Sequence, residues 1–127
     1  LGYKWQGIDV SPKSNRVVQM DFNYLNYPDE CFDVVFCCHS LEHSENPSKT
    51  LREFWRVLRP NGVLFLATPN CVKRQILEED EDHISVVNEW QMERLLRYTM
   101  FKKIYITLES YDGLEDFQWS LITVAKK

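Results

Sequence analysis

The sequence predicts an α/β domain built around an open, mostly parallel β-sheet. Residues 33–38 (DVVFCC) and 63–67 (VLFLA) are short apolar runs rich in β-forming residues, and a helical pattern lies between them. A strand, a helix and a second strand in this order are typical of the crossover that joins two parallel strands. Because residues 33–38 are apolar after the first position, we expect this strand to be covered on both faces.

Two shorter strands are expected ahead of this unit. Residues 3–9 (YKWQGID) end at Asp9, and residues 16–20 (RVVQM) lead to Asp21. The intervening SPKSN segment is too short for a packed crossover helix, since such a connection needs about a dozen residues. Residues 22–31 then contain several turn-forming residues and are expected to form a loop.

The crossover helix is expected to begin at Asn46 and Pro47, because proline is favoured at the first helical position. Apolar residues then recur with the i, i+3, i+4, i+7 spacing of a buried helix face. That face comprises Leu51, Phe54, Trp55 and Leu58. Pro60 and Gly62 are expected to end the helix.

The last third of the chain predicts a second helix and an antiparallel hairpin. Asn88 followed by Gln91 resembles a capping box at a helix start. Residues 101–109 and 117–125 predict two strands, and the connection between them carries an Asp-Gly turn signal at 112–113. The apolar surface expected for the helix comprises Trp90, Leu95, Leu96 and Tyr98.

Composition limits the classes of protein to consider. A chain of 127 residues is large enough for a single hydrophobic core. The net charge of −4 argues against a general nucleic-acid binder. No apolar run approaches the roughly 20 residues that span a bilayer, so no membrane partner is expected. The acidic run at 78–82 is expected to be solvated. The chain starts with leucine and has no signal-like segment, so we expect a processed, cut or incomplete beginning.

The four cysteines do not form a metal-binding or disulfide pattern. Cys37 and Cys38 are neighbours in a predicted strand, so their side chains point to opposite faces. No C-x-x-C pair is present. Buried, reduced thiols in a cytoplasmic protein are therefore expected.

Two aspartates at successive strand ends suggest a nucleoside site. A carboxylate has several lone pairs and can accept hydrogen bonds from both hydroxyl groups of a ribose, which suits Asp9. Asp21 could accept from an exocyclic amine, and Phe22 beside it could pack on a purine ring. Strand-end aspartates also commonly cap turns, so each one alone is weak evidence.

Four segments in order resemble a known family. GIDVSP, VVQMDF, YPDECFDVVFCCHSLEH and LREFWRVLRPNGVLFLATPN resemble successive motifs of class I S-adenosylmethionine-dependent methyltransferases, over residues 7–70. The similarity is to the group with FD-V-LEH followed by RVLRP-G, and residues 82–101 resemble the family's last helix and strand pair more loosely. The resemblance implies a Rossmann-like sheet with a C-terminal antiparallel hairpin, in a single, partial domain over 1–127.

The resemblance also implies a missing element. Members normally begin with a strand and a glycine-rich loop that holds the carboxypropyl tail of the cofactor, and LGYKWQ contains no such loop. That first strand lies centrally in the family's sheet, between the strands predicted at 3–9 and 33–38. We therefore expect an N-terminally truncated member with an exposed strand edge, which a homodimer could cover.

By the same resemblance, the cofactor S-adenosylmethionine would contact residues at the strand ends. Asp9 and Val10 would lie at the ribose, Asp21 and Phe22 at the adenine, and Cys38 at the methionine portion. His39, Glu42 and His43 would face the methyl-transfer site, with His39 the first candidate for a catalytic base and His43 the second. Alternatively, both histidines brace or cap the loop.

The HSLEH segment at 39–43 is similar to two kinds of metal-binding motif. It fits the H-x-x-E-H signature of inverted zinc peptidases, but Asn46 and Pro47 leave it about one turn of helix. Some members of the methyltransferase family place a divalent ion at an E-x-x-E-H segment, and here His39 stands where the first glutamate would be. We therefore expect no metal ligand. His83 either lines a substrate pocket or lies on the surface.

The function expected from the sequence is S-adenosylmethionine-dependent methyl transfer to a small-molecule acceptor. No N/D-P-P-Y segment of amino-methylating DNA enzymes is present, and the acidic charge favours a small molecule over nucleic acid. The alternative is a methyltransferase-like fold that binds no cofactor and acts as an interaction module, or is a fragment of a longer enzyme.

Overall fold

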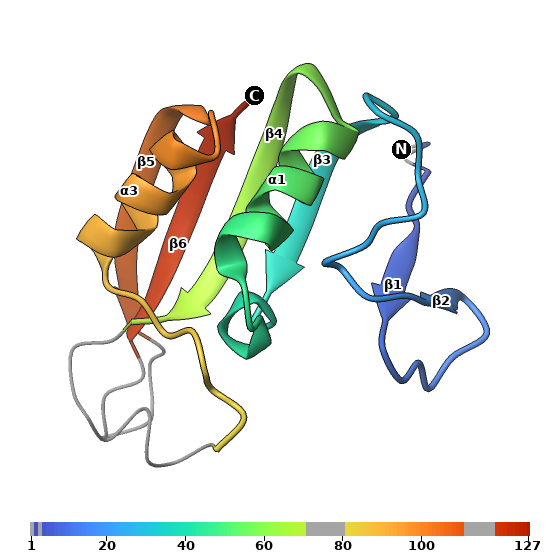
Figure 1. The fold of residues 1–127 in the computed structure, drawn as a ribbon, viewed down its shortest axis with the longest axis horizontal. Coiled ribbons are helices and arrows are strands. Elements are labelled where there is room, and N and C mark those ends of the chain that lie inside the picture. The colour runs from blue at the N-terminus through green and yellow to red at the C-terminus, as the bar shows by residue number, and fades with distance from the viewer. Residues whose placement is uncertain (1, 3, 71–80, 111–118) are drawn as a thin grey trace.

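The computed structural model describes residues 2, 4–70, 81–110 and 119–127 (Figure 1). The strands form two sheets: a parallel β1–β2 pair, and a four-stranded sheet in the order β3-β4-β6-β5. β3 and β4 are parallel, whereas β6 is antiparallel to both of its neighbours. This arrangement confirms the predicted fold class. The strands are β1 (Gly7–Asp9), β2 (Val17–Gln19), β3 (Phe32–Cys38), β4 (Leu58–Pro69), β5 (Lys102–Ser110) and β6 (Trp119–Lys126).

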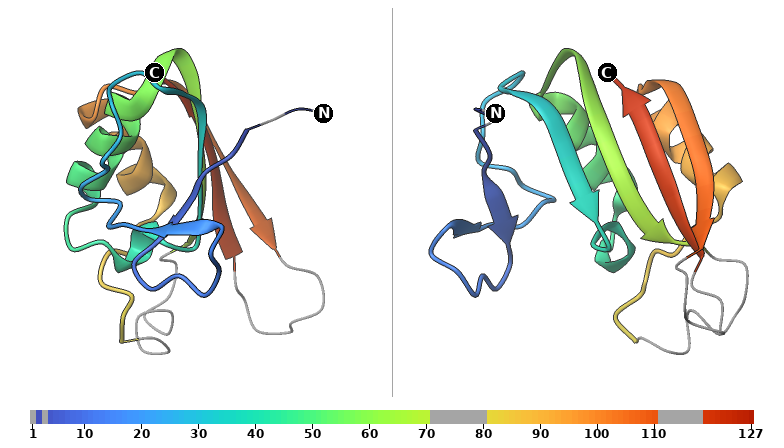
Figure 2. Two further views of the ribbon diagram at one scale, coloured as in Figure 1. Left: turned by 90° about the vertical axis from the view of Figure 1, so that its right-hand side faces the viewer. Right: turned by 180° about the vertical axis from the view of Figure 1, so that it is seen from behind.

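Two α-helices cover one face of the four-stranded sheet (Figure 2). They are α1 (Pro47–Val57) and α3 (Glu89–Tyr98), and a short 3₁₀ helix, η1 (Leu41–His43), follows β3. The Asn46 side chain caps α1 by accepting from the Lys49 amide, and Asn88 and Gln91 form the predicted capping box of α3. No helix in the described part of the chain is both long and apolar enough to cross a bilayer.

The core lies between these helices and the sheet. Each helix contributes a narrow apolar face, and the sheet contributes alternate residues of its strands. The α3 face differs from the prediction, because Trp90 and Tyr98 are 75% and 66% exposed while Met92 and Leu96 are fully buried. The fully buried aliphatic residues include Leu51, Leu58, Leu64, Met92, Leu96, Leu121 and Ala125.

The expectation that β3 is covered on both faces is wrong. Val34 and Phe36 are 51% and 74% exposed, because α1 and α3 lie on the other side of the sheet (Figure 2). Phe36 begins a cross-strand row on this open face, formed by Phe36, Phe65, Val124 and Tyr105. A continuous apolar row of this kind is unusual on a free surface.

The two adjacent cysteines point to opposite faces, as predicted, but only one of them is buried. Cys37 faces the helices, and burial raises the pKa of its thiol to about 12, which makes it a poor nucleophile. Cys38 is exposed on the open face, contrary to the expectation of buried thiols. Cys71, the acidic run at 78–80 and the turn signal at 112–113 lie outside the described residues.

The junction between α1 and β4 also differs from the prediction. The helix ends at Val57, and Leu58 is already extended and paired with Phe32 of β3. The ladder then skips to Val34 and Val63, so residues 59–62 form a bulge in β4. A side chain at Gly62 would place its Cβ 2.8 Å from the Arg59 carbonyl oxygen, so this close backbone approach requires glycine.

The two sheets are not joined by a strand ladder. β1 and β3 are separate in the described structure, and a cavity of about 360 Å³ lies between their residues. Its lining includes Ile8 from β1 and Val34 and Phe36 from β3. The resemblance in sequence places a further strand at this position, so the edge of β3 opposite β4 is the exposed edge that was predicted.

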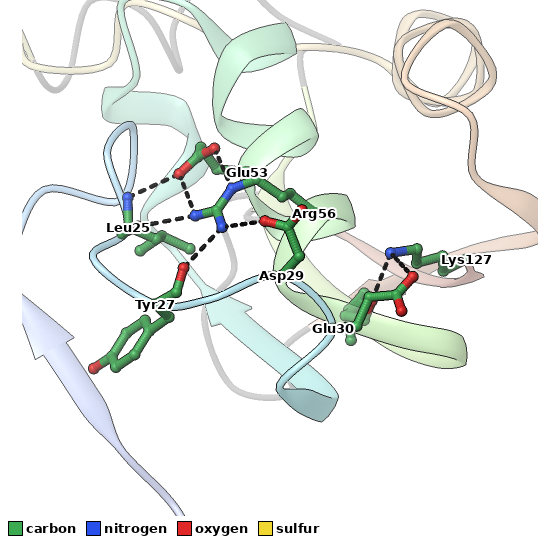
Figure 3. A network of polar contacts seen from close by, with 8 residues as sticks. Leu25, Tyr27, Asp29, Glu30, Glu53, Arg56 and Lys127 are labelled. Atoms are coloured by element: carbon green, nitrogen blue, oxygen red, sulfur yellow. Dashed lines mark hydrogen bonds and ion pairs between the residues drawn. The ribbon is translucent and has the colours of Figure 1, made fainter.

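A half-buried arginine network connects the β1–β2 unit to the main sheet (Figure 3). The Arg56 guanidinium donates to the carbonyl oxygens of Leu25 and Tyr27 and to the carboxylates of Asp29 and Glu53, at 2.8–3.0 Å. Glu53 in turn accepts from the Leu25 amide at 2.9 Å. Helix α1 thereby fixes the 22–31 loop, which leads from β2 into β3.

The ionisation of this pair reflects the same contacts. The hydrogen bonds from Arg56 lower the pKa of the Glu53 carboxyl, although partial burial acts in the opposite direction. The hydrogen bonds that Arg56 donates to Glu53 and Asp29 raise the pKa of Arg56, which therefore stays charged at all working pH values. The network is therefore a charged, planar clamp that lysine cannot reproduce.

Replacing Arg56 by lysine should destabilise the fold. A single ammonium group cannot reach two carbonyls and two carboxylates at once, so the free energy of unfolding should fall by roughly 1–3 kcal/mol. Chemical denaturation measures this change. The control is Arg97→Lys, because Arg97 forms an exposed pair with Glu93 on α3 and should change stability by no more than about 0.5 kcal/mol. Equal losses of stability in Arg56→Lys and Arg97→Lys would contradict the stabilising role of the Arg56 network.

Acid should weaken the same network by protonating Glu53. Because the pKa of Glu53 is lower in the folded than in the unfolded state, its contribution is complete above the ordinary glutamate pKa of about 4.3. The contribution is lost as the pH falls from there through the lowered value. Urea unfolding between neutral pH and pH 3 should show a steeper acid loss in the wild type than in Glu53→Gln. The exposed Glu93→Gln variant should follow the wild type; a wild-type slope in Glu53→Gln would refute this linkage.

Candidate functional site

Asp9 and Asp21 lie at the ends of two paired strands. Asp9 is the last residue of β1, and its carbonyl oxygen accepts from the Met20 amide at 2.9 Å, one residue before Asp21. Each carboxylate uses one oxygen in a local turn, toward the Ser11 amide and toward Asn23 respectively. Both side chains are exposed, so each presents its second oxygen at the same end of the β1–β2 pair.

Cys38 and His39 lie at the corresponding end of β3. In Figure 1 the arrowheads of β1, β3 and β4 point toward the same end of the molecule. His39 leaves the strand with a φ of 45°, in the left-handed region that a residue other than glycine rarely adopts. Its amide is fixed by the Ala67 carbonyl oxygen at 2.8 Å. Such strained turns are concentrated at functional sites, because the surrounding structure must support them.

Most of the residues predicted for cofactor binding line one of two neighbouring cavities. Val10, Asp21 and Phe22 line a cavity of about 490 Å³, together with the predicted catalytic residue His43 and with Lys49 at its wall. Phe22 also lines the 360 Å³ cavity between the sheets, where Cys38 contributes. The predicted residues that line neither cavity are Asp9 and His39. Phe22 is therefore the residue that the two cavities share.

Phe22 is also held by the core. Its ring makes an edge contact with Phe54 of α1, with ring centroids 6.4 Å apart. Nearby, the Thr50 and Ser44 hydroxyls donate to the side-chain oxygen of Asn23 at 2.6 and 3.3 Å. This polar contact joins the loop after Asp21 to helix α1 and was not predicted, since nothing in the local sequence indicates which distant hydroxyl an asparagine in a loop contacts.

Glu42 is the buried centre of the η1 turn. Its side chain is 1% exposed, and neither carboxylate oxygen makes a hydrogen bond within the described residues. The Nδ1 atom of His39 lies 3.6 Å from Oε1 of Glu42, and the His39 side chain is 40% exposed. Nε2 of His39 lies 3.4 Å from the Ser120 hydroxyl. The turn thus orients a half-exposed imidazole against a buried carboxylate.

A distant segment packs against this turn. The Ser85 amide donates to the Glu42 carbonyl oxygen at 2.8 Å, and the Ser85 hydroxyl donates to the Ser44 carbonyl oxygen. Nδ1 of His43 lies 3.0 Å from the Asp82 carbonyl oxygen. The rings of His43 and His83 are consequently 5.0 Å apart, and His83 is half-buried. The sequence alone separated these histidines by 40 positions and gave no sign that they meet.

The first half of the chain matches a known protein family. The family model for the methyltransferase domain matches residues 3–66. The probable methyltransferase ltbC of Aspergillus luteorubrus is 39% identical over 61 residues, which cover 46% of this chain and 21% of that protein. A ubiquinone biosynthesis O-methyltransferase of Xanthomonas oryzae pv. oryzae is 33% identical over 85 residues, covering 55% and 36% respectively. The chain therefore spans only a minor part of the length of these relatives.

Solved structures show the same fold over a larger share of the chain. A SAM dependent methyltransferase from Archaeoglobus fulgidus superposes with a TM-score of 0.77 at 20% identity, covering 96% of this chain and 75% of that one. The [4+2]-cyclase SpnF superposes with a TM-score of 0.72, also at 20% identity. Because the family model matches half of the chain and the architecture agrees, the chain belongs to the methyltransferase domain family.

Proposed function

We propose that this chain forms the methyl-donor-binding part of an S-adenosylmethionine-dependent methyltransferase that acts on a small molecule. The observation that carries the proposal is the pair of exposed carboxylates, Asp9 and Asp21, at adjoining strand ends, where Asp21 lines the cavity of Phe22 and His43. The names of the relatives support it, since they include O-methyltransferases and a phosphoethanolamine N-methyltransferase that was solved with S-adenosylhomocysteine.

The described residues fit the nucleoside half of this cofactor. In the proposal, Asp9 accepts from the two ribose hydroxyls, next to the 61% exposed Val10, and Asp21 accepts from the adenine amine. Phe22 packs on the ring from the shared cavity wall. Cys38 and His39 lie beside the methionine portion. The bound cofactor supplies an electrophilic methyl group on a sulfonium, and the task of the protein is to align an acceptor with it.

His39, just before η1, and His43, its last residue, are the proposed catalytic residues. His39 is the first candidate for the base that removes a proton from the acceptor, because Glu42 lies against its Nδ1 and would stabilise the imidazolium that forms. His43 lines the cavity beside Asp21 and is the second candidate. A neutral imidazole is suited to this role because its ordinary pKa is close to 6.5.

The alternative function is a methyltransferase-like module without cofactor, or a fragment of a longer enzyme. The observation that favours it is the separation of the β1–β2 pair from β3. The methionine end of a cofactor would lie near this separation, where the cavity of 360 Å³ is open between the two sheets. Measurement of cofactor binding distinguishes the two functions.

Calorimetry with S-adenosylhomocysteine tests the proposed function. The 127-residue chain should bind the ligand, and Asp9→Asn should weaken binding at least about tenfold, because charge-assisted hydrogen bonds to the ribose are lost. The control is Asp33→Asn, since Asp33 is an exposed aspartate at the opposite end of β3 that pairs with Arg59. Absence of binding at millimolar ligand would favour the alternative, and unchanged affinity of Asp9→Asn would refute the ribose role.

We further propose that two copies of the chain associate through the exposed edge of β3. An unpaired strand edge with apolar neighbours is a template for a second strand, and Phe36 adjoins this edge. The pairing would also cover part of the row of Phe36, Phe65, Val124 and Tyr105 on the open face.

Light scattering measures the expected dimer. Phe36→Lys places a charge beside the edge and should shift the protein toward the monomer. Tyr105→Lys is the matched control, because Tyr105 lies on the outer strand β5 and is similarly exposed, at 67% against 74% for Phe36. A wild-type protein that remains a monomer at high concentration would rule out the association.

A further inference from the structure

Glu42, His43 and His83 form a group of metal-ligating side chains that the proposed methyl transfer does not need as a group. One ligand atom from each of the three residues lies within 4.8 Å of the others. Two of the residues come from η1 and the third from the segment that packs against it. We propose that these three side chains bind one divalent transition-metal ion, with Zn²⁺ as the best match. This proposal goes beyond the proposed function and does not depend on it; with the ion bound, Glu42 and His43 serve as its ligands and His39 remains the candidate base.

The burial of Glu42 is the independent observation that points to a cation. A carboxylate that is 1% exposed and makes no hydrogen bond among the described residues carries an uncompensated desolvation cost. The contact with His39 at 3.6 Å is longer than a hydrogen bond and compensates only if that histidine is protonated. A bound cation would satisfy the carboxylate directly.

The hydrogen bond of His43 prepares its ring for a metal. A carbonyl oxygen can only accept, so the 3.0 Å contact with Asp82 requires the proton to be on Nδ1 of His43. The lone pair of the neutral ring then lies on Nε2. Metal-binding histidines usually donate their other nitrogen to a carbonyl or carboxylate in this way, which fixes the ring and its tautomer.

The donor set favours zinc over magnesium or calcium. Two imidazole nitrogens and one carboxylate oxygen match the three protein ligands of open zinc sites, whereas the two hard cations take oxygen ligands. Zinc bonds of about 2.0–2.2 Å place tetrahedral donors roughly 3.3 Å apart, so the side chains must close by rotation. His43 is exposed, so its ring can tilt toward the ion about the hydrogen bond that Nδ1 makes to Asp82. His43 also lines the 490 Å³ cavity, so the ion would lie at its wall.

Zinc titration of the metal-free 127-residue chain tests the proposal. One equivalent of Zn²⁺ should remain bound after dialysis, as measured by elemental analysis, and should raise the melting temperature. His83→Gln should lower the zinc affinity at least about tenfold, because one of three ligands is lost. Glu42→Gln should do the same, and the metal-free form of this variant should be at least as stable as the wild type, since a buried charge is removed.

Controls separate this site from adventitious binding. Glu45→Gln removes an exposed carboxylate of the same turn region and should bind zinc as the wild type does. Co²⁺ in place of zinc should give the visible bands of a tetrahedral nitrogen and oxygen site without an intense near-ultraviolet thiolate band. The proposal is overturned by less than stoichiometric zinc, by equal affinity in His83→Gln, or by a thiolate band that assigns the ion to cysteine. If Glu42→Gln does not fold, His83→Gln and the cobalt spectrum decide the question.

Discussion

The five donors of Arg56 are the constraint on which the site geometry depends. The β1–β2 pair shares no ladder with the main sheet, so the orientation of Asp9 and Asp21 relative to His39 rests on the 22–31 loop. Arg56 and Glu53 anchor that loop to α1 through its carbonyl and amide groups. A helix that packs on the core thereby positions the edge that carries Asp9 and Asp21, which lies outside the core.

Several side chains capable of acid–base chemistry or metal binding lie where β3 ends. A left-handed residue, a buried carboxylate and two further histidines lie in or against the short span from Cys38 to Ser44. Backbone contacts hold both sides of this span, from Ala67 to His39 and from Ser85 to Glu42. Because these backbone contacts hold the turn rigidly, a buried carboxylate and ionisable histidines can lie close together in it.

The sequence predicted what depends on local chemistry. The caps at Asn46 and Asn88 and the two β-forming runs appear where propensity and capping place them. The start of β4 was missed, because Pro60 and Gly62 are typical of a helix end and here form a bulge within a strand. Exposure of Phe36 was also missed, since an apolar strand does not reveal which of its faces will be covered. The grouping of Glu42, His43 and His83 was not predictable, because it depends on how residues 81–85 dock.

The docking of residues 81–85 has a consequence for how this protein can diversify. The Ser85 amide donates to the Glu42 carbonyl oxygen, and the Ser85 hydroxyl and the His43 imidazole contact the carbonyl oxygens of Ser44 and Asp82, so each of these contacts has a main-chain acceptor. The side chain of Ile84, within this segment, is 56% exposed. The residue at position 84 can therefore change in evolution, and the surface shape of this loop with it, without breaking the hydrogen bonds that attach residues 81–85 to η1.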